Sequence, residues 1–217
     1  MRKILIALSF AAIAYAGCKK KDTTVSQVVT ASYPTVLITG SQYVSIPVGG
    51  SFTPPSATAY DSFYKENLSV VKDLGTLNNN VPGLYTVVYS AKNHYGFVGT
   101  ANVYVAVTSI TDTLDLTGWY ERLTPTRSAH ITKISRGLFM TSNVGGVDTT
   151  DPTTGAQISA VFAVLNDTTI DFGSQLTSGG PLSATSQTLT LDPGDTTINY
   201  ALNLSGFGTQ VRTFVKQ

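Results

Sequence analysis

The spacing of the apolar residues is the feature that most constrains the fold of this chain. Beyond residue 17, apolar side chains recur in short alternating runs, as in Val44–Val48, Tyr85–Tyr89 and Val103–Val107, and Gly, Pro, Asn or Asp separates one run from the next. A period of two places every second side chain on the same face of a β-strand. No stretch after Ala14 has the period of an ordinary helix. We therefore expect an all-β protein.

The first residues have the pattern of an export signal. Two basic residues precede an apolar run at 4–14, which is too short to span a bilayer as a helix. The small residues Ala16 and Gly17 stand directly before Cys18, the only cysteine of the chain. In the lipoprotein motif that this segment resembles, the cysteine receives a diacylglyceryl group before cleavage. We expect a signal peptide at 1–17 and a membrane anchor at Cys18; the alternative is an ordinary secretory peptide with a chance cysteine.

Charge and cysteine content restrict the partners and the forces that hold the fold. Cleavage would remove two of the 14 Lys and Arg residues and none of the 13 Asp and Glu residues, so the mature chain is close to neutral. A near-neutral chain lacks the positive electrostatic potential that attracts nucleic acid, so we expect no nucleic-acid partner. With no cysteine after Cys18 there is no internal disulfide. Each folded unit must be held by its apolar core.

The chain divides into a tether and two folded units. Residues 18–32 are polar and without a sustained period, and they read as a flexible tether beside the lipid. The alternating runs at 33–108 predict a β-sandwich. The pattern breaks after Ser109, which places a domain boundary near 108–112 and a second β-domain at 112–217.

The first unit carries the motifs of a known family. They are Pro34, Gly40, Val48-Gly49, Phe52, Ala57-Thr58-Ala59, the segment Pro82 to Ala91, and Gly96. On these residues, 34–107 resembles the bacterial immunoglobulin-like domains that are repeated in surface lipoproteins and adhesins. The resemblance implies a sandwich in which Tyr85 forms a tyrosine corner and Val87 stands where antibody domains have cysteine. Where this chain has Pro54 and Asn93, the family often has Asp. Domains of this family act as spacers or adhesive modules, which is the role that the resemblance implies.

The second unit predicts eight further strands. They are expected at 119–123, 129–134, 138–142, 158–165, 169–172, 188–191, 197–204 and 209–215. Turn sequences such as Arg136-Gly137 and Asn166-Asp167 separate neighbouring runs. So many short strands predict an antiparallel barrel or a sandwich, and the sequence leaves both open.

The second unit contains the motifs Gly118-Trp119-Tyr120, Ile131-Thr132-Lys133, Gly137-Leu138-Phe139, Ser142-Asn143 and Gly145-Gly146. On these motifs the unit is similar, more weakly, to C-terminal domains of unknown function in Bacteroidota lipoproteins. Relatives tend to have Asp at the position of Asn143. Some of these proteins are encoded beside outer-membrane glycan-uptake systems, so the resemblance implies a glycan-related role by association.

Residues able to perform acid–base chemistry are few. His94 lies in an expected hairpin and His130 on an expected strand, and we assign both a structural or exposed role. Ser128 lacks the strained turn that presents a nucleophilic serine. Glu121 and Asp171 are the strand-borne acids that a glycosidase would need as a pair. We expect no catalytic residue and no cofactor.

A binding surface is easier to place. Trp119 and Tyr120, with Arg122 and Arg127 nearby, could stack on and orient a sugar ring if they are exposed. A lone Trp in a small β-domain can instead fill the core, and the sequence leaves this alternative open. The loop at 141–155 is the longest feature that packing does not explain.

Two further patterns involve aspartate. Asp148 and Asp151 lie in a Gly-rich loop, but their spacing fits no EF-hand, so we expect no metal site. The pair Asp-Thr recurs along the chain and resembles the acceptor motif for O-glycosylation in Bacteroidota; the candidate acceptors are Thr23, Thr113, Thr149, Thr168 and Thr196. The alternative is that Asp-Thr joins a turn to a strand.

The sequence thus favours a non-enzymatic lipoprotein of the cell envelope. We expect it in the outer membrane, facing the surface or the periplasm, with the immunoglobulin-like domain as a spacer. The C-terminal domain would bind a glycan or another cell-envelope protein. The alternative is a glycan-processing enzyme with its site in the C-terminal domain.

Overall fold

The structure is a computed structural model that describes residues 31–151, 153, 155–192 and 194–217. These residues form strands without an α-helix, which confirms the all-β prediction. Ser32–Gln217 is one compact unit. The predicted signal peptide, Cys18 and Thr23 lie outside the described residues. In the part of the chain that the structure describes, no helix has the length and apolar character needed to cross a membrane.

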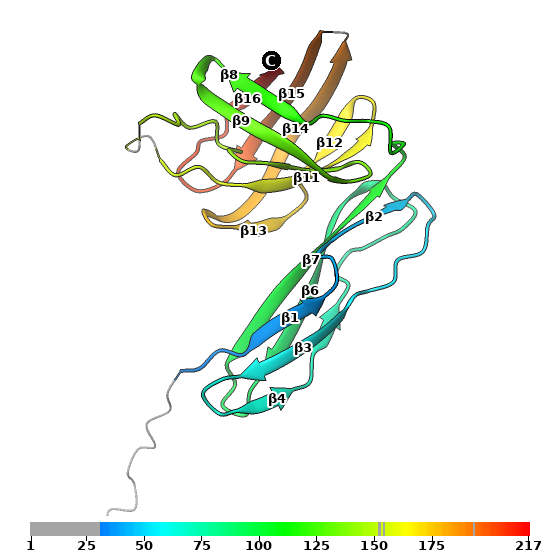
Figure 1. The fold of residues 1–217 in the computed structure, drawn as a ribbon, viewed down its shortest axis with the longest axis vertical. Coiled ribbons are helices and arrows are strands. Elements are labelled where there is room, and N and C mark those ends of the chain that lie inside the picture. The colour runs from blue at the N-terminus through cyan, green and yellow to red at the C-terminus, as the bar shows by residue number, and fades with distance from the viewer. Residues whose placement is uncertain (1–30, 152, 154, 193) are drawn as a thin grey trace, which may run out of the picture. The chain divides into compact units, whose positions relative to one another are not determined.

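The N-terminal half is a sandwich of two sheets (Figure 1). One sheet has the order β1-β3-β4, with β1 at Thr35–Thr39, β3 at Ser56–Asp61 and β4 at Glu66–Leu68. The other has the order β2-β7-β6-β5, with β2 at Tyr43–Pro47, β7 at Val98–Thr108, β6 at Gly83–Lys92 and β5 at Val71–Asp73. Strand β2 runs parallel to β7, and the other pairs are antiparallel.

Alternation along β6 builds the core of the sandwich. Val87 and Tyr89 are fully buried, and they pack with Val103 and Val105 of β7. The Tyr85 hydroxyl donates a hydrogen bond of 2.9 Å to the carbonyl oxygen of a residue four positions upstream, Val81. This is the tyrosine corner that the resemblance implied.

The C-terminal half is an eight-stranded antiparallel barrel with one added strand. Its strands are β8 (Gly118–Arg122), β9 (Thr124–Ser135), β10 (Leu138–Thr141), β11 (Ala160–Asn166), β12 (Thr169–Asp171), β14 (Gly180–Asp192), β15 (Asp195–Asn203) and β16 (Val211–Lys216), and β13 (Gln175–Thr177) pairs with β14. The chain of neighbours runs β12-β11-β10-β9-β8-β16-β15-β14, and a pairing between Thr169 and Thr188 joins its ends. That pairing decides the question that the sequence left open: the domain is a barrel.

Strand β14 is much longer than the prediction for residues 188–191. Its first part contains Ser183, Thr185, Ser186 and Gln187, which give no apolar alternation. Pairing with β15 holds this polar segment as a strand, with a register shift between Thr185 and Thr188. Strand β13 was not predicted either, and its pairing with β14 holds it as a strand.

Aromatic side chains fill the barrel. Phe139, Phe162, Phe172, Tyr200 and Phe214 form a continuous row in which neighbouring ring centroids lie 5.7, 5.3, 4.6 and 5.7 Å apart. All five are almost completely buried. The barrel interior is therefore a packed core, and a binding site must lie at an end or on the outer surface.

A third apolar cluster contains residues of both halves. Its buried members are Leu84, Ala106, Leu138, Val161 and Ala163. Beside it, the backbone N–H of Leu84 donates to an Asp171 carboxylate oxygen at 2.8 Å, and the Thr108 hydroxyl donates to the Val164 carbonyl oxygen. The domain boundary at 108–112 stays a prediction.

Candidate binding site at one end of the barrel

The loop between β10 and β11 is held in place by one buried side chain. The Asn143 amide nitrogen donates to the carbonyl oxygens of Ser128, at 3.0 Å, and Val147, at 2.9 Å. Its oxygen accepts from the Val147 backbone N–H at 3.2 Å. The Tyr200 hydroxyl inside the barrel donates to the Val144 carbonyl at 2.8 Å. These bonds fix the loop on the barrel end.

Two glycines let this loop approach its neighbours closely. A Cβ atom on Gly145 would lie 2.1 Å from the Phe207 ring, and one on Gly146 would lie 2.4 Å from Arg122 Cδ. Gly146 also has a φ of +58°, which favours glycine. As a result the Gly145 carbonyl accepts from Arg212 Nε at 3.0 Å, and the Gly146 carbonyl accepts from Arg122 Nη1 at 3.2 Å.

A cavity of about 510 Å³ opens beside these glycines. Arg122, Arg127 and Arg212 contribute to its wall. The rest of the wall is glycine, small and apolar residues: Gly145, Gly146, Val147, Gly155, Ala156, Ile158, Gly179, Ser205, Gly206 and Phe207. The described residues of the lining thus supply three cationic groups and no acidic group.

None of the three arginines forms an ion pair with a described carboxylate, since the ion pairs among the described residues are His94–Glu66 and Lys133–Asp112. Burial and the neighbouring Arg127 lower the pKa of Arg122. Burial and Arg122 likewise lower the pKa of Arg212. The positive charges at this end of the barrel therefore repel one another.

The arginines have different roles. Arg212 is buried, and it donates to the carbonyl oxygens of Gly145, Gln210 and Phe207, so its guanidinium is committed to the loops. Arg122 makes one hydrogen bond to the protein, and the Arg127 side chain makes none with a described residue. These two retain donors for a ligand. A bound anion would relieve the repulsion among all three.

The structure separates the four residues predicted to form one binding surface. It brings Arg122 and Arg127 to the same cavity. Trp119 lies on the outer face of the barrel, 56% exposed, with its ring edge-on to His130 at a centroid distance of 5.0 Å. The alternative that its indole fills the core is wrong.

Tyr120 does not belong to the binding surface. It is fully buried, and its hydroxyl donates to the Leu116 carbonyl at 3.0 Å. Burial raises its pKa. The reason is strand alternation: neighbours on β8 point to opposite faces, so Trp119 and Tyr120 cannot contact the same ligand face.

The acids considered for catalysis are not brought together. The Asp171 carboxylate accepts from the backbone N–H groups of Leu84 and Gly173, each at 2.8 Å, and from Gln187 at 3.4 Å. No described contact joins it to Glu121. Asp171 is thus engaged in structural hydrogen bonds.

The aspartates of the Gly-rich loop form turns. Asp148 accepts from the backbone N–H and the hydroxyl of Thr150, and Asp151 accepts from the same two groups of Thr153. Among the described residues, no three His, Cys, Asp or Glu side chains are grouped to hold a metal ion. The candidate acceptors Thr113, Thr149 and Thr168 are exposed and Thr196 is half-buried, so O-glycosylation stays a prediction.

Arg212 and Phe207 are among the cavity residues that sequence reasoning missed. Both lie far along the chain from Arg122. The pairing of β16 with β8 brings Arg212 near Arg122, and Phe207 lies in the connection between β15 and β16. The unexplained Gly-rich loop was the one signal in the sequence that pointed to this end of the barrel.

Comparison with known proteins bears on the N-terminal half. Residues 36–107 match the family described as "Bacterial surface protein, Ig-like domain". Curated protein sequences gave no match. Among solved structures, the lipoprotein BT2262 from Bacteroides thetaiotaomicron is similar to the chain at 24% identity, with a TM-score of 0.39, covering 85% of this chain and 100% of that one. A domain type of surface proteins fits a place in the cell envelope. Residues 36–107 are a bacterial surface immunoglobulin-like domain.

Proposed function

We propose that this chain is a lipid-anchored, non-enzymatic protein of the bacterial surface whose barrel binds a glycan with an acidic group. The immunoglobulin-like domain would be a spacer between the anchor at Cys18 and the barrel. The observation that carries the proposal is the cavity at the barrel end, where three arginines meet and no described carboxylate pairs with them.

The chemistry of the cavity favours an anion of modest size. Guanidinium groups bind carboxylates and sulfates through paired N–H donors. A volume of about 510 Å³ lies within the range of small-molecule sites. A protein partner would usually bury a broader surface. An acidic sugar residue within a glycan satisfies both the charge and the size.

The residues available support binding without turnover. Among the described residues that line the cavity, none is a carboxylate, a histidine or another group that titrates near neutral pH. Acid–base catalysis needs such a group within hydrogen-bond reach of the substrate. Binding needs only the donors that Arg122 and Arg127 provide.

The test compares an acidic ligand with its neutral counterpart. We expect calorimetry to show binding of a glucuronate-containing oligosaccharide and little binding of the carboxyl-reduced form. Arg122→Gln and Arg127→Gln should each weaken binding about 10- to 100-fold, as expected for loss of a hydrogen bond to a charged group. Arg136→Gln is the matched control, because Arg136 does not line the cavity.

Two results would contradict this function. Equal affinity for the acidic and reduced sugars would show that the arginines do not recognise an acidic group. Cleavage of the oligosaccharide, detected by mass spectrometry and lost on changing Glu121 or Asp171, would favour the glycan-processing enzyme instead.

The anchor is tested separately. Cys18→Ala removes the thiol that takes the diacylglyceryl group, so the variant should move from the detergent phase to the aqueous phase of a Triton X-114 separation. Unchanged partitioning would exclude lipidation at this residue. Protease treatment of intact cells would then decide whether the protein faces the surface or the periplasm.

A further inference from the structure

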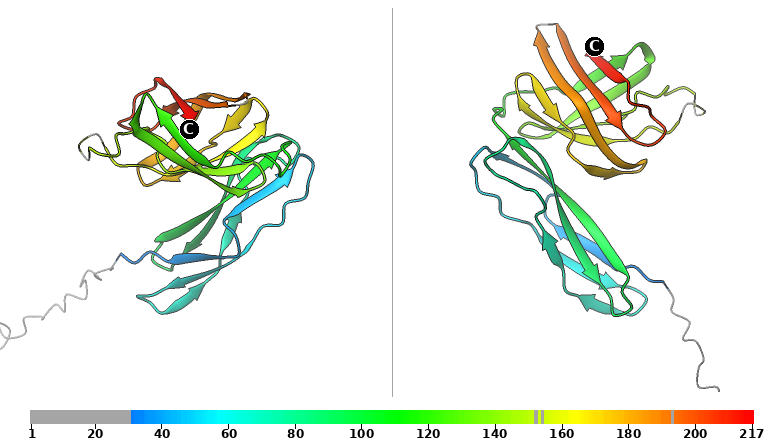
Figure 2. Two further views of the ribbon diagram at one scale, coloured as in Figure 1. Left: turned by 45° about the horizontal axis from the view of Figure 1, so that its top comes forward. Right: turned by 180° about the vertical axis from the view of Figure 1, so that it is seen from behind.

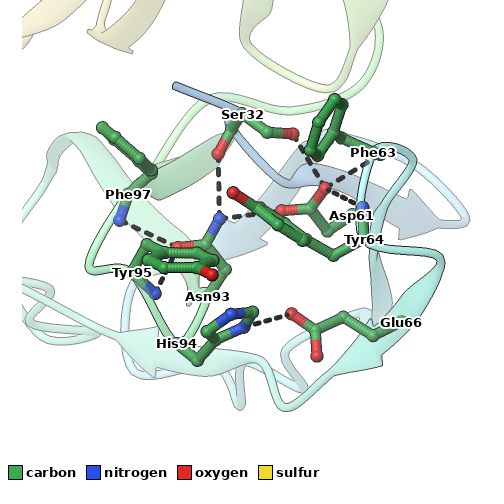
Figure 3. Close-up of polar contacts among 9 residues, drawn as sticks. All are labelled: Ser32, Asp61, Phe63, Tyr64, Glu66, Asn93, His94, Tyr95 and Phe97. Atoms are coloured by element: carbon green, nitrogen blue, oxygen red, sulfur yellow. Dashed lines mark hydrogen bonds and ion pairs between the residues drawn. The ribbon is translucent and has the colours of Figure 1, made fainter. Parts of the chain in front are cut away.

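An aromatic cluster occupies the end of the sandwich at which β1 begins. We call it the aromatic tip; its members are Tyr33, Phe63, Tyr64, Tyr95 and Phe97. They come from the segment before β1, the β3–β4 turn and the β6–β7 hairpin, which meet at this end (Figures 1 and 3). Figure 2 shows the same end from two further directions.

The rings form two contacting groups at this end and remain open to solvent. Tyr33 and Phe97 have centroids 5.3 Å apart, and Tyr64 lies 4.9 Å from both Phe63 and Tyr95. Even so, Tyr33 is 65% exposed, Phe63 57% and Tyr95 37%. Exposed apolar groups gathered in this way mark contact sites.

Asn93 joins the three segments of the tip. Its buried amide nitrogen donates to Asp61 Oδ2 at 2.8 Å and to the Ser32 carbonyl at 2.9 Å (Figure 3). Its oxygen accepts from the backbone N–H groups of Tyr95, at 3.1 Å, and Phe97, at 3.0 Å. The hairpin is thereby fixed to both the β3–β4 turn and the start of the described chain.

Asp61 completes this network. One carboxylate oxygen accepts from the Ser32 hydroxyl at 2.7 Å and from the backbone N–H groups of Phe63, at 3.0 Å, and Tyr64, at 3.2 Å. The buried polar groups thus hold the rings of the tip in place, so little entropy is lost when the tip contacts a partner.

The charges around the tip do not repel a membrane. Lys65 and Lys92 are exposed near these turns, whereas Glu66 pairs with His94 at 3.2 Å. Asp61 is the other acid among the described residues of these turns, and it is buried. The exposed surface therefore combines aromatic rings with two positively charged lysines. This combination suits anionic or zwitterionic headgroups.

The length of the chain before the tip limits its distance from the proposed anchor. Ser32 follows Cys18 by 14 residues. Even when fully extended, such a segment reaches at most about 50 Å. A lipid on Cys18 would keep the aromatic tip within this distance of the bilayer, and tethering at short range makes even a weak contact well populated.

We propose that the aromatic tip rests in the headgroup region of the bilayer that holds the lipid on Cys18. Tyrosine rings, with an apolar body and a polar hydroxyl, concentrate at that boundary, and Phe63 adds apolar area. The contact would orient the sandwich relative to the membrane. It rests on the lipid anchor of the proposed function.

The test uses a tryptophan reporter at the tip. The lipidated full-length mature protein with Phe63→Trp and Trp119→Phe is reconstituted into phosphatidylethanolamine–phosphatidylglycerol vesicles that contain lipids brominated near the headgroup. We expect at least twofold quenching of the fluorescence at position 63. The matched control is the protein with its native Trp119 alone, whose emission should stay unchanged. Tyr95→Trp in the Trp119→Phe background is a second reporter, should Phe63→Trp disturb folding.

The outcomes separate this proposal from the anchor. If the protein does not sediment with vesicles, lipidation at Cys18 fails. If it sediments but both tip reporters are quenched no more than Trp119, the membrane contact alone is overturned. A dimer in detergent that is lost on Phe63→Ser would assign the tip to a second copy, and this too would overturn the proposal.

Discussion

At position 93 an amide does what a carboxylate could not do. Asn93 donates to Asp61 Oδ2 at 2.8 Å while its own oxygen accepts from two backbone N–H groups. An Asp at this position could keep the turn contacts but would place a second negative charge beside Asp61. We expect Asn93→Asp to destabilise the protein by about 2 to 3 kcal/mol in urea denaturation at neutral pH. The destabilisation should shrink in acid, where the two carboxyls can share a proton; the same loss at every pH would contradict this account.

Asp61 itself makes the stability of the wild-type protein sensitive to acid. Burial raises its pKa, but the hydrogen bonds from Asn93, Ser32 and the N–H groups of Tyr64 and Phe63 outweigh this and lower the pKa below its ordinary value. Because the pKa of Asp61 is lower in the folded state, its ionisation stabilises the fold at pH values above the unfolded pKa of about 4. This stabilisation is lost as the pH falls further. We expect the urea concentration at the unfolding midpoint to decrease once the pH is below that value. The decrease should be smaller in Asp61→Asn. An equal fall in both proteins would show that other acids are responsible.

At the scale of single elements, two strands are anchored by the same device. The hydroxyls of Tyr85, before the middle of β6, and Tyr120 in β8 each donate to a carbonyl four residues upstream. The Tyr120 bond is buried and the Tyr85 bond is exposed. Removing a buried donor leaves an acceptor without water, so we expect Tyr120→Phe to cost about 1 to 3 kcal/mol and Tyr85→Phe less than about 1 kcal/mol. Thermal unfolding of both variants measures the difference, and equal costs would contradict the role of burial.

At the scale of the whole molecule, the segment after β7 is part of the barrel core. Ile110 and Leu116 are buried in the barrel cluster, and the Ser109 N–H donates to the Leu165 carbonyl at 3.2 Å. If the barrel folds alone, a chain of residues 109–217 should be more stable than one of residues 114–217 by about 3 kcal/mol, because the shorter chain lacks Ile110. Equal unfolding midpoints would show that this anchor is dispensable.

The apolar cluster that contains Leu84 and Val161 joins residues of both halves, and proteolysis tests whether the halves separate. Limited proteolysis of the full chain should cut first at the exposed residues 111–113 and release a stable barrel fragment that starts near Leu114. Resistance of this segment to protease would show that the two halves behave as one core.

The sequence by itself determined the local structure, because strand formation, turns and the tyrosine corner depend on residues close together in the chain. The period-two runs predict β-structure, and the resemblance to immunoglobulin-like domains implied the corner that Tyr85 makes with the Val81 carbonyl. Alternation also separates Trp119 from Tyr120, although it does not say which of the two faces inward.

The tertiary structure decided everything that depends on which distant strands meet. Pairing of Thr169 with Thr188 closes the barrel, and closure places Trp119 outside and Tyr120 inside. The pairing of β16 with β8 brings Arg212 beside Arg122, and both line the cavity. The sequence contains each of these residues, but long-range pairing is set by the packing of the whole core, which no local pattern encodes.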